Sequence, residues 1–217
     1  MEQIRNQLRA IKSLAGPFPS FHVEEASERP YELFLEWLGG AIEHGVHEPH
    51  AMTLSTIDHD GTPDARVLIL KDVDERGWYF ASSLESRKGQ QIACNPGVAL
   101  TFYWPGLGRQ IRIRGKAVSM AEELSAQDFL NRGAVARAIA LIGKQSAILD
   151  KREDFEEAFE QQMNRISQTP DVVAPSWTLY RVEAQEVEFW QGNEERKHKR
   201  LRYRLDGEKW IKNLLWA

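Results

Sequence analysis

The stretch RVLILKDVDERGWYFASSLESRKGQQI, residues 66–92, decides the fold. It predicts two apolar strands, residues 66–71 and 78–82, joined by a turn and followed by a helix that opens at Ser86. Basic side chains stand at both ends of the first strand and again where the helix begins. Because a helix N-terminus presents unpaired N–H groups and arginine presents a planar fork, this segment is typical of a phosphate-binding site.

The same basic residues admit a second interpretation. Most Lys and Arg side chains are solvated charges at the ends of strands and helices. Ser86 is a good N-cap residue, however, and cations directly after a cap oppose the helix dipole unless an anion is bound there. This argument favours the anion site. Its candidate residues are Arg66, Lys71, Ser86, Arg87 and Lys88.

Further strands surround that stretch. Residues 51–57 predict a strand that turns at Gly61 into the next one, and residues 98–104 and 110–118 predict two more. Short strands with hairpin turns favour an antiparallel barrel or sandwich, in which closure removes the exposed edges. The strands expected to complete the same barrel are residues 176–182, 186–190 and 210–215.

Helical periodicity is expected outside these strands. Pro30 is expected to start a helix that ends near Gly45. The preceding residues 1–29 are interrupted by a Gly-Pro step and predict a flexible arm, and residues 30–217 predict a single domain. The class is therefore β-rich α+β with peripheral helices. The helices expected in the middle of the chain are residues 121–131, 134–142 and 151–167.

Composition excludes several classes of function. The net charge of −4 gives no reason to expect a nucleic-acid or membrane partner. Cys94 is the one cysteine, so an intrachain disulfide is impossible and a reducing cytoplasm is the simplest expectation. The six histidines are dispersed, and His44, His47 and His50 are separated by Gly45 and Pro49, so no metal is expected.

A second constellation of polar residues has mixed donor and acceptor character. Glutamine amides suit a heterocycle such as an isoalloxazine or a pyrimidine ring, because they both donate and accept. Taken one by one, these residues are more typical of a protein surface. The set comprises Gln110, Lys144, Gln145 and Ser146.

A basic segment near the C-terminus forms a third candidate. Six Lys or Arg occupy the nine positions of residues 196–204, which is one pattern seen in nucleic-acid binding. Residues 200–204 alternate basic with apolar or aromatic side chains, however, which indicates the solvent face of a strand. Arg196 and His198 lie two apart, so in an extended chain they would point the same way. Such a pair could hold an anionic substrate and supply a titratable group.

No dinucleotide, Walker or nucleophile-elbow motif is present. Instead, blocks in the right order resemble the pyridoxine/pyridoxamine 5'-phosphate oxidase family of FMN-binding split-barrel proteins, over residues 30–215. The blocks are RVLILK at 66–71, SRKGQQI at 86–92, NPGVAL at 95–100, RQIRIRGKA at 109–117, KQS at 144–146, and EFWQG with RKHKR at 188–200.

The resemblance implies a homodimeric split barrel with FMN at the subunit interface. Ala81 replaces one member of a Tyr-Thr pair of the family, while Ser82 keeps a hydroxyl for the phosphate. The positions that match the family's flavin ligands are Arg66, Lys71, Ser82, Ser86, Arg87, Lys88, Gln110, Gln145, Ser146, Trp190 and Arg200.

On the substrate side the resemblance is less complete. Asp128 stands where the vitamin B6 oxidases have a Tyr, and Ala136 stands where they have a Ser. An aspartate repels a phosphate and an alanine donates no hydrogen bond. The resemblance implies that Arg196 and His198 are catalytic. It implies that substrate is held by Lys71, Asp128, Arg132, Ala136, Arg196 and His198.

The Arg-x-x-Tyr lid of the vitamin B6 enzymes is missing, and residues 16–21 and 48–51 resemble the phenazine-biosynthesis oxidases of the same superfamily. Lys71 and Arg87 are closer to the vitamin B6 enzymes. The hypothesis is an FMN-dependent oxidase that passes a hydride from a planar heterocycle to FMN and then to O2, with a reduced carboxylated tricycle favoured as substrate. Two alternatives stay open: an oxidase that makes pyridoxal 5'-phosphate, and a non-catalytic flavin-binding protein.

Overall fold

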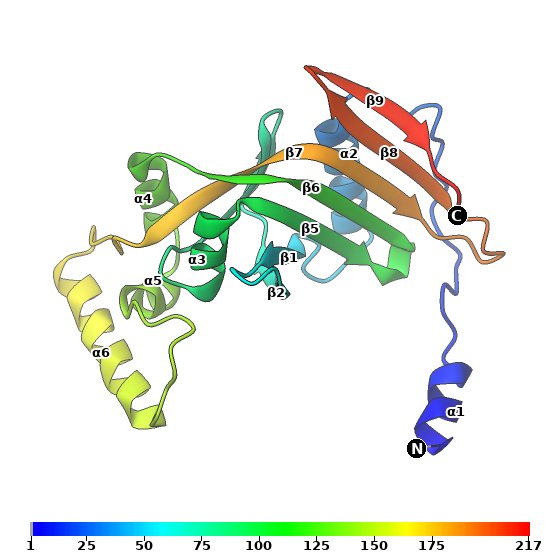
Figure 1. Ribbon diagram of the computed structural model, residues 1–217. Coiled ribbons are helices and arrows are strands. Elements are labelled where there is room, and N and C mark those ends of the chain that lie inside the picture. Colours follow the sequence, from blue (N-terminus) through cyan, green and yellow to red (C-terminus); the bar gives the residue numbers. More distant parts are fainter. Residues whose placement is uncertain (1) are drawn as a thin grey trace. The chain divides into compact units, whose positions relative to one another are not determined.

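The computed structural model describes residues 2–217 (Figure 1). Its helices are α1 (Glu2–Ala10), α2 (Pro30–Glu43), α3 (Arg87–Cys94), α4 (Glu122–Leu130), α5 (Ala134–Leu141) and α6 (Arg152–Gln168), with a 3-10 turn η1 (Pro105–Leu107). Its strands are β1 (Ala51–Ile57), β2 (Pro63–Ile69), β3 (Asp72–Asp74), β4 (Gly77–Ser83), β5 (Gly97–Trp104), β6 (Arg109–Ser119), β7 (Trp177–Gln191), β8 (Lys199–Asp206) and β9 (Lys209–Leu214).

The strands form one sheet in the order β2-β1-β5-β6-β7-β4-β3, with β8 paired to β7 and β9 paired to β8. The pairs β3 with β4, β4 with β7, β7 with β8, and β8 with β9 are all antiparallel. Figure 1 shows β8 and β9 as a hairpin near the C-terminus. The expected β-rich α+β class with antiparallel strands and peripheral helices is confirmed.

Contacts divide the chain into two compact units. Residues 1–52, 100–113 and 185–217 form the first, of which the structure describes 2–52 and the two later segments. Its core is aromatic. Edge-to-face ring pairs join Phe21 to Trp37, Trp37 to Phe189, and Phe189 to Tyr203, with ring centroids 5.0, 5.2 and 5.7 Å apart. Such pairs add to the stabilisation from apolar burial, which explains part of the high tryptophan and phenylalanine content.

Residues 53–99 and 114–184 form the second unit. Phe80 on β4 stacks on Tyr180 of the neighbouring strand at 5.2 Å, and both side chains are buried. Phe129 on α4 packs edge-on against Trp177 at the start of β7, with centroids 5.9 Å apart. These contacts fix α4 against the β4–β7 pair, and this unit carries most of the predicted phosphate and substrate residues.

Two strand predictions need correction. The expected strands 176–182 and 186–190 are one continuous strand, β7, in which buried residues alternate as far as Ala184 and the alternation then changes phase, so that Val187 and Phe189 are buried. The expected strand 66–71 begins earlier, at Pro63, and ends at Ile69. Lys71 therefore lies between β2 and β3, where its backbone N–H donates to the carbonyl of Tyr79 over 2.8 Å.

The predicted start of α3 is confirmed. Ser86 is extended, with φ −67° and ψ 155°, and its Oγ accepts a hydrogen bond from the Gly89 N–H over 3.2 Å. A Cβ at Gly89 would lie closer than 3.0 Å to the carbonyl oxygens of Ser83 and Leu84. Only glycine lets α3 sit this close to the end of β4. Within residues 2–217, no helix is long and apolar enough to cross a membrane.

Candidate active site

The first part of the site lies where β4 ends and α3 begins. Lys88 is 7% exposed, and its Nζ donates to Ser86 Oγ over 3.3 Å. Ser82 Oγ lies 3.3 Å from the same Ser86 oxygen. Burial lowers the pKa of Lys88, and the nearby charge of Arg66 lowers it further. No carboxylate in residues 2–217 forms an ion pair with this ammonium, so the structure holds a buried cation without an anionic partner.

Arg66 is held beside this cation by a network on β1, β2 and α3. Its guanidinium donates to Thr56 Oγ1 over 2.5 Å and to Gln91 Oε1 over 3.2 Å. Asp64, two residues earlier on the same strand, pairs with Arg66 at 2.6 Å. The network fixes the Arg66 guanidinium, which is what a preorganised anion site requires.

Arg87 has different surroundings from Lys88, although the two are adjacent in sequence. Its guanidinium pairs with Asp58 at 3.0 Å and with Asp64 at 3.4 Å, and its side chain is 62% exposed. The structure thus brings Arg66, Ser82, Ser86 and Lys88 together and directs Arg87 toward the β1–β2 turn. Its predicted phosphate contact stays a prediction.

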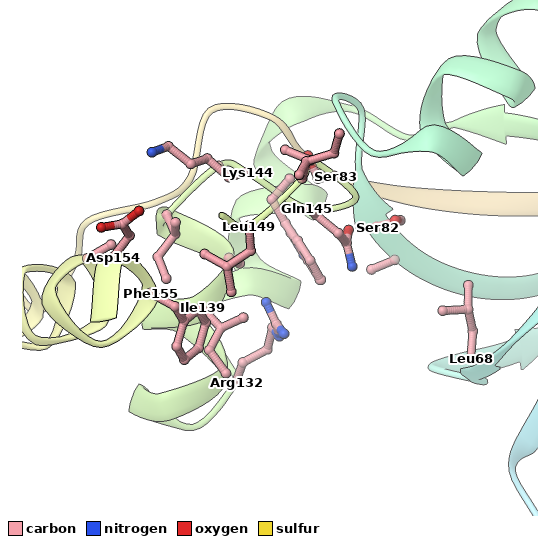
Figure 2. A pocket seen from close by; sticks show the side chains of 18 of the residues that line it. Leu68, Ser82, Ser83, Arg132, Ile139, Lys144, Gln145, Leu149, Asp154 and Phe155 are labelled. Carbon is pink, nitrogen blue, oxygen red and sulfur yellow. The ribbon is translucent and has the colours of Figure 1, made fainter. Parts of the chain in front are cut away.

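A cavity of about 650 Å³ forms the second part of the site (Figure 2). Its walls are mainly aliphatic, with Ile69 from β2 and Ile139, Ile142, Ile148 and Leu149 from α5 and the segment after it. Figure 2 shows Ser82, Gln145 and Arg132 around the opening. The polar residues that line it are Lys71, Ser82, Ser83, Arg132, Lys144, Gln145, Asp150 and Asp154.

Asp128 on α4 makes two contacts behind this wall. One carboxylate oxygen lies 3.3 Å from Lys71 Nζ. The other accepts a hydrogen bond from the Trp177 indole N–H over 2.8 Å. The Asp128 side chain is 14% exposed and is not part of the cavity lining. The Asp128 carboxylate, which was predicted to face a substrate phosphate, is thus paired with Lys71 and hydrogen-bonded to Trp177.

Arg132 completes the cationic end of the cavity. Its guanidinium carbon lies 3.9 Å from the centroid of the Trp177 ring, within the range of a cation–π contact. One guanidinium nitrogen, Nη1, is buried and has no hydrogen-bond partner in the described chain. Burial lowers the pKa of Arg132, and the charge of Asp128 opposes that change. Arginine stays protonated under either influence, so Arg132 is an available cation.

Three other predicted residues lie nearby in sequence. Gln145 lines the cavity, whereas the adjacent Ser146 is exposed with a φ of 75°. Ala136 on α5 is half-buried and does not line the cavity. Ala81 does line it, at the position where the family has a larger residue. The missing side chain leaves the cavity wider at that point.

In the first unit, Arg196 and His198 lie on the turn between β7 and β8, before β8 begins at Lys199. The expectation that they point the same way in an extended chain is wrong, because Arg196 is in the left-handed region with φ 65°. Its Nη2 donates to Ser13 Oγ over 3.2 Å. His198 Nδ1 accepts the Asn193 N–H over 3.1 Å, which leaves the proton of the neutral ring on Nε2.

The remaining flavin candidates of the first unit lie on the strands beside that turn. The Trp190 ring lies 4.9 Å from the His198 ring. Arg200 donates through Nε to the buried Glu188 over 2.8 Å and through Nη1 to the Trp216 carbonyl over 2.8 Å. Gln110 is half-buried on β6. Arg200 thus has a structural role in anchoring the end of the chain, besides any contact with a cofactor.

Two important residues were missed in the sequence. Trp177 holds Asp128 and stacks on Arg132, but it appeared only as the edge of an expected strand. Asp64 pairs with Arg66, and here a signal existed, because residues two apart on a strand point to the same face. No signal of that kind joins Trp177 to Asp128, which are 49 positions apart in the sequence.

Comparisons with known proteins identify the family. The family model described as pyridoxamine 5'-phosphate oxidase matches residues 38–161, and a model described as the C-terminal dimerisation region of pyridoxine 5'-phosphate oxidase matches residues 177–217. In residues 2–217 no cluster of three or more His, Cys, Asp or Glu residues could hold a metal ion.

Two curated relatives show how far the similarity extends. The pyridoxine/pyridoxamine 5'-phosphate oxidase of Ectopseudomonas mendocina is 41% identical over 188 residues, which are 86% of this chain and 87% of the relative. That of Gloeothece citriformis is 39% identical over 212 residues, 97% of each chain.

Solved structures show the fold. PhzG from Burkholderia lata, determined in complex with tetrahydrophenazine-1-carboxylic acid, has a TM-score of 0.86 at 29% identity, covering 93% of this chain and 100% of PhzG. An FMN-binding protein from Nostoc punctiforme has a TM-score of 0.69 at 16% identity, covering 88% of this chain and 99% of its own. The antiparallel split-barrel fold is confirmed. The chain belongs to the pyridoxamine 5'-phosphate oxidase family.

Proposed function

We propose that this protein is an FMN-dependent oxidase that works as a homodimer in the cytoplasm. The observation that carries the proposal is the buried, unpaired Lys88 beside Arg66 and the hydroxyls of Ser82 and Ser86. A buried ammonium next to another cation is costly unless an anion joins it. A terminal phosphate supplies that anion, and the N-terminus of α3 adds backbone donors and a favourable dipole.

When bound, FMN supplies the redox chemistry, by accepting a hydride from the substrate and passing both electrons to O2 to give hydrogen peroxide. Lys88, Ser82 and Ser86 would hold its phosphate, with the guanidinium of Arg66, which is paired with Asp64, beside them. The residues proposed to contact the rest of the cofactor are Lys71, Arg87, Gln110, Gln145, Ser146, Trp190 and Arg200.

We propose a reduced, carboxylated tricycle as substrate. The cavity of about 650 Å³ has aliphatic walls, which suit a flat apolar ring system. Arg132 offers one planar cation at its end, and a guanidinium pairs with a carboxylate through two parallel hydrogen bonds. The PhzG structure was solved with a ligand of this class, which adds support at 29% identity.

Arg196 and His198 are proposed to orient the substrate. With Nδ1 engaged by the Asn193 N–H, the His198 ring keeps a fixed orientation against Trp190, and its Nε2–H is available to donate a hydrogen bond. Arg196 accommodates the negative charge of the substrate. A pure flavin carrier, the alternative from another class, has no need of either side chain.

Oxidation of pyridoxine or pyridoxamine 5'-phosphate is the second candidate. It is favoured by the names of the curated relatives, at 41% and 39% identity, and by Lys71. A phosphate substrate needs cations that are free to meet it, whereas here Asp128 engages Lys71 and residue 136 is an alanine without a hydrogen-bond donor.

The test begins with purified protein reconstituted with FMN and freed from excess cofactor. Under anaerobic conditions, a reduced phenazine carboxylate should bleach the flavin spectrum, and admission of O2 should restore it with one hydrogen peroxide per flavin. Faster bleaching by pyridoxamine 5'-phosphate would reverse the order of substrates. A flavin that no heterocycle reduces would favour the carrier, and failure to bind FMN would contradict both.

The role of Arg196 is tested by Arg196→Ala. We expect turnover to fall by at least about 100-fold while flavin stays bound, because the cofactor phosphate is held elsewhere. Arg204→Ala, which removes an exposed arginine of β8, is the matched control and should leave turnover unchanged. Equal activity of the two variants would remove Arg196 from the mechanism.

A further inference from the structure

We infer that Asp128 is a specificity residue that makes the cavity select a carboxylate over a phosphate. The inference rests on the proposed function and concerns the same cavity. It starts from the finding that Asp128 lies between Lys71 Nζ, at 3.3 Å, and the Trp177 indole nitrogen, at 2.8 Å.

Pairing with Asp128 removes Lys71 from anion recognition. An ammonium at 3.3 Å from a carboxylate, on a side chain that is 32% exposed, presents little net charge to a ligand. Trp177 keeps the carboxylate in place, because its N–H binds the second oxygen and its ring packs on Phe129. Trp177 thus holds the Lys71–Asp128 ion pair in place beside the cavity.

The same tryptophan positions the remaining cation. Arg132 lies 3.9 Å above the Trp177 ring, and its Nη1 is buried without a hydrogen-bond partner. One stacked guanidinium matches a planar, singly charged carboxylate. A phosphate monoester brings close to two charges at neutral pH, and the nearby Asp128 repels the excess.

The aliphatic walls increase the difference in affinity between a carboxylate and a phosphate. Ile139, Ile142 and Leu149 offer no hydrogen-bond donors, and the side-chain donors of the lining besides Arg132, Lys71 and Trp177 are Ser82, Ser83, Lys144 and Gln145. A phosphate oxygen buried against the aliphatic side loses its hydration with no compensation. A carboxylate on an apolar ring has only two oxygens, and Arg132 can satisfy both.

The wild-type protein gives the first test. Calorimetric titration of the FMN-incubated protein with pyridoxal and with pyridoxal 5'-phosphate measures how much the phosphate group adds to the affinity, because the two ligands have the same ring. We expect the phosphate to improve affinity by less than about threefold. An improvement above tenfold would overturn the inference without any variant.

The second test uses Asp128→Asn, which keeps size and can still accept the Trp177 hydrogen bond. It frees Lys71, so the ratio of affinities for pyridoxal 5'-phosphate and phenazine-1-carboxylate should shift toward the phosphate by about tenfold. Asp154→Asn is the matched control, since Asp154, labelled in Figure 2, lines the same cavity. It should shift the ratio by less than twofold, because Lys71 is paired with Asp128 and the Asp154 change leaves that pair in place.

The outcomes separate this inference from the proposed function. An unchanged ratio in Asp128→Asn, or an equal shift in Asp154→Asn, overturns the role of Asp128 even where the protein is yellow and reducible. If Asp128→Asn does not fold, Asp128→Ser is measured in the same way. Calorimetry measures the ratio of the two affinities whether or not flavin is bound. If the protein failed to bind FMN, the proposed oxidase would be contradicted, but the measured ratio would still test the role of Asp128.

Discussion

Two regions of the second unit use the same kinds of charge in opposite ways. At the start of α3, Lys88 is buried and forms no ion pair with a carboxylate of the described chain. At the end of the cavity, the comparable lysine, Lys71, carries its own carboxylate, Asp128. We propose that an anion from outside completes the first region, whereas the charge of Lys71 in the second is largely neutralised by Asp128.

The difference shows that a cation by itself does not identify its ligand. Hydroxyls and helix N–H groups surround Lys88, and these donors suit the several oxygens of a phosphate. An aromatic ring and aliphatic walls surround Arg132, and these suit a flat carboxylate. The surroundings of the cation, rather than its charge, decide which anion it takes.

The largest effect is expected from Lys88→Met. Losing the charge-assisted hydrogen bond to the phosphate should weaken FMN binding about 100-fold. The free energy of unfolding of the flavin-free protein should stay the same or rise, because an uncompensated buried charge is removed. Flavin fluorescence titration and urea denaturation measure the two quantities.

Lys116→Met, which removes an exposed lysine of β6, is the control for that variant and should change neither quantity. If Lys88→Met bound FMN as tightly as the wild type, Lys88 would not be a ligand of the cofactor phosphate. The proposed contrast between Lys88, which meets an external anion, and Lys71, which is paired with Asp128, would then be contradicted.

Gly89→Ala tests whether the geometry of α3 matters. A Cβ there would collide with the carbonyl oxygens of Ser83 and Leu84, so α3 must shift away from β4. We expect a loss of about 2 kcal/mol in the free energy of unfolding, together with weaker FMN binding. The preference between carboxylate and phosphate ligands should not change, and a changed preference would mean that the two regions are coupled.

Glu188→Gln tests a carboxylate outside both regions. Burial raises the pKa of Glu188, but the hydrogen bond from Arg200 and the charge of Arg112 outweigh it, and the pKa falls below 4.5. The stabilisation is therefore complete above pH 4.5 and is lost as the pH falls through the lowered pKa. The variant should lose about 2 kcal/mol at pH 7 and less at pH 3.5.

Denaturation curves at both pH values check this prediction for Glu188. A loss of the same size at both would show that the ion pairs with Arg112 and Arg200 contribute nothing to it.

The smallest effect is expected from Trp177→Phe. It removes the N–H that holds Asp128 but keeps a ring beneath Arg132, so the preference should move toward phosphate by about threefold. Calorimetric titration with the same two ligands as for Asp128→Asn measures the shift. A movement toward the carboxylate would contradict the role given to this hydrogen bond.

Much of the fold could be predicted because its signals are local. Strands β1 and β6 and the cap of α3 follow from alternation over a few residues and from Ser86. The joining of two expected strands into β7 could not be predicted, since the alternation of buried residues that runs through Ala184 changes phase before Val187 and resembles a break between two strands.

The candidate site divides in the same way. The grouping of Ser86 and Lys88 could be predicted, because they are neighbours in sequence at the start of a helix, and their phosphate ligand stays a prediction. The turn that carries Arg196 was misjudged, because its positive φ depends on Asn193 and on the arm that reaches it through Ser13.

The sequence by itself determined the class, the antiparallel strands and the capped start of α3 at Ser86, because capping and alternation act over a few residues. Only the tertiary structure decided the partners of Asp128. Lys71, Asp128 and Trp177 lie on separate elements, and the packing of α4 against β7 brings them together. A charge has its effect through its neighbours in space, and neighbours that lie far apart in the sequence are chosen by the fold.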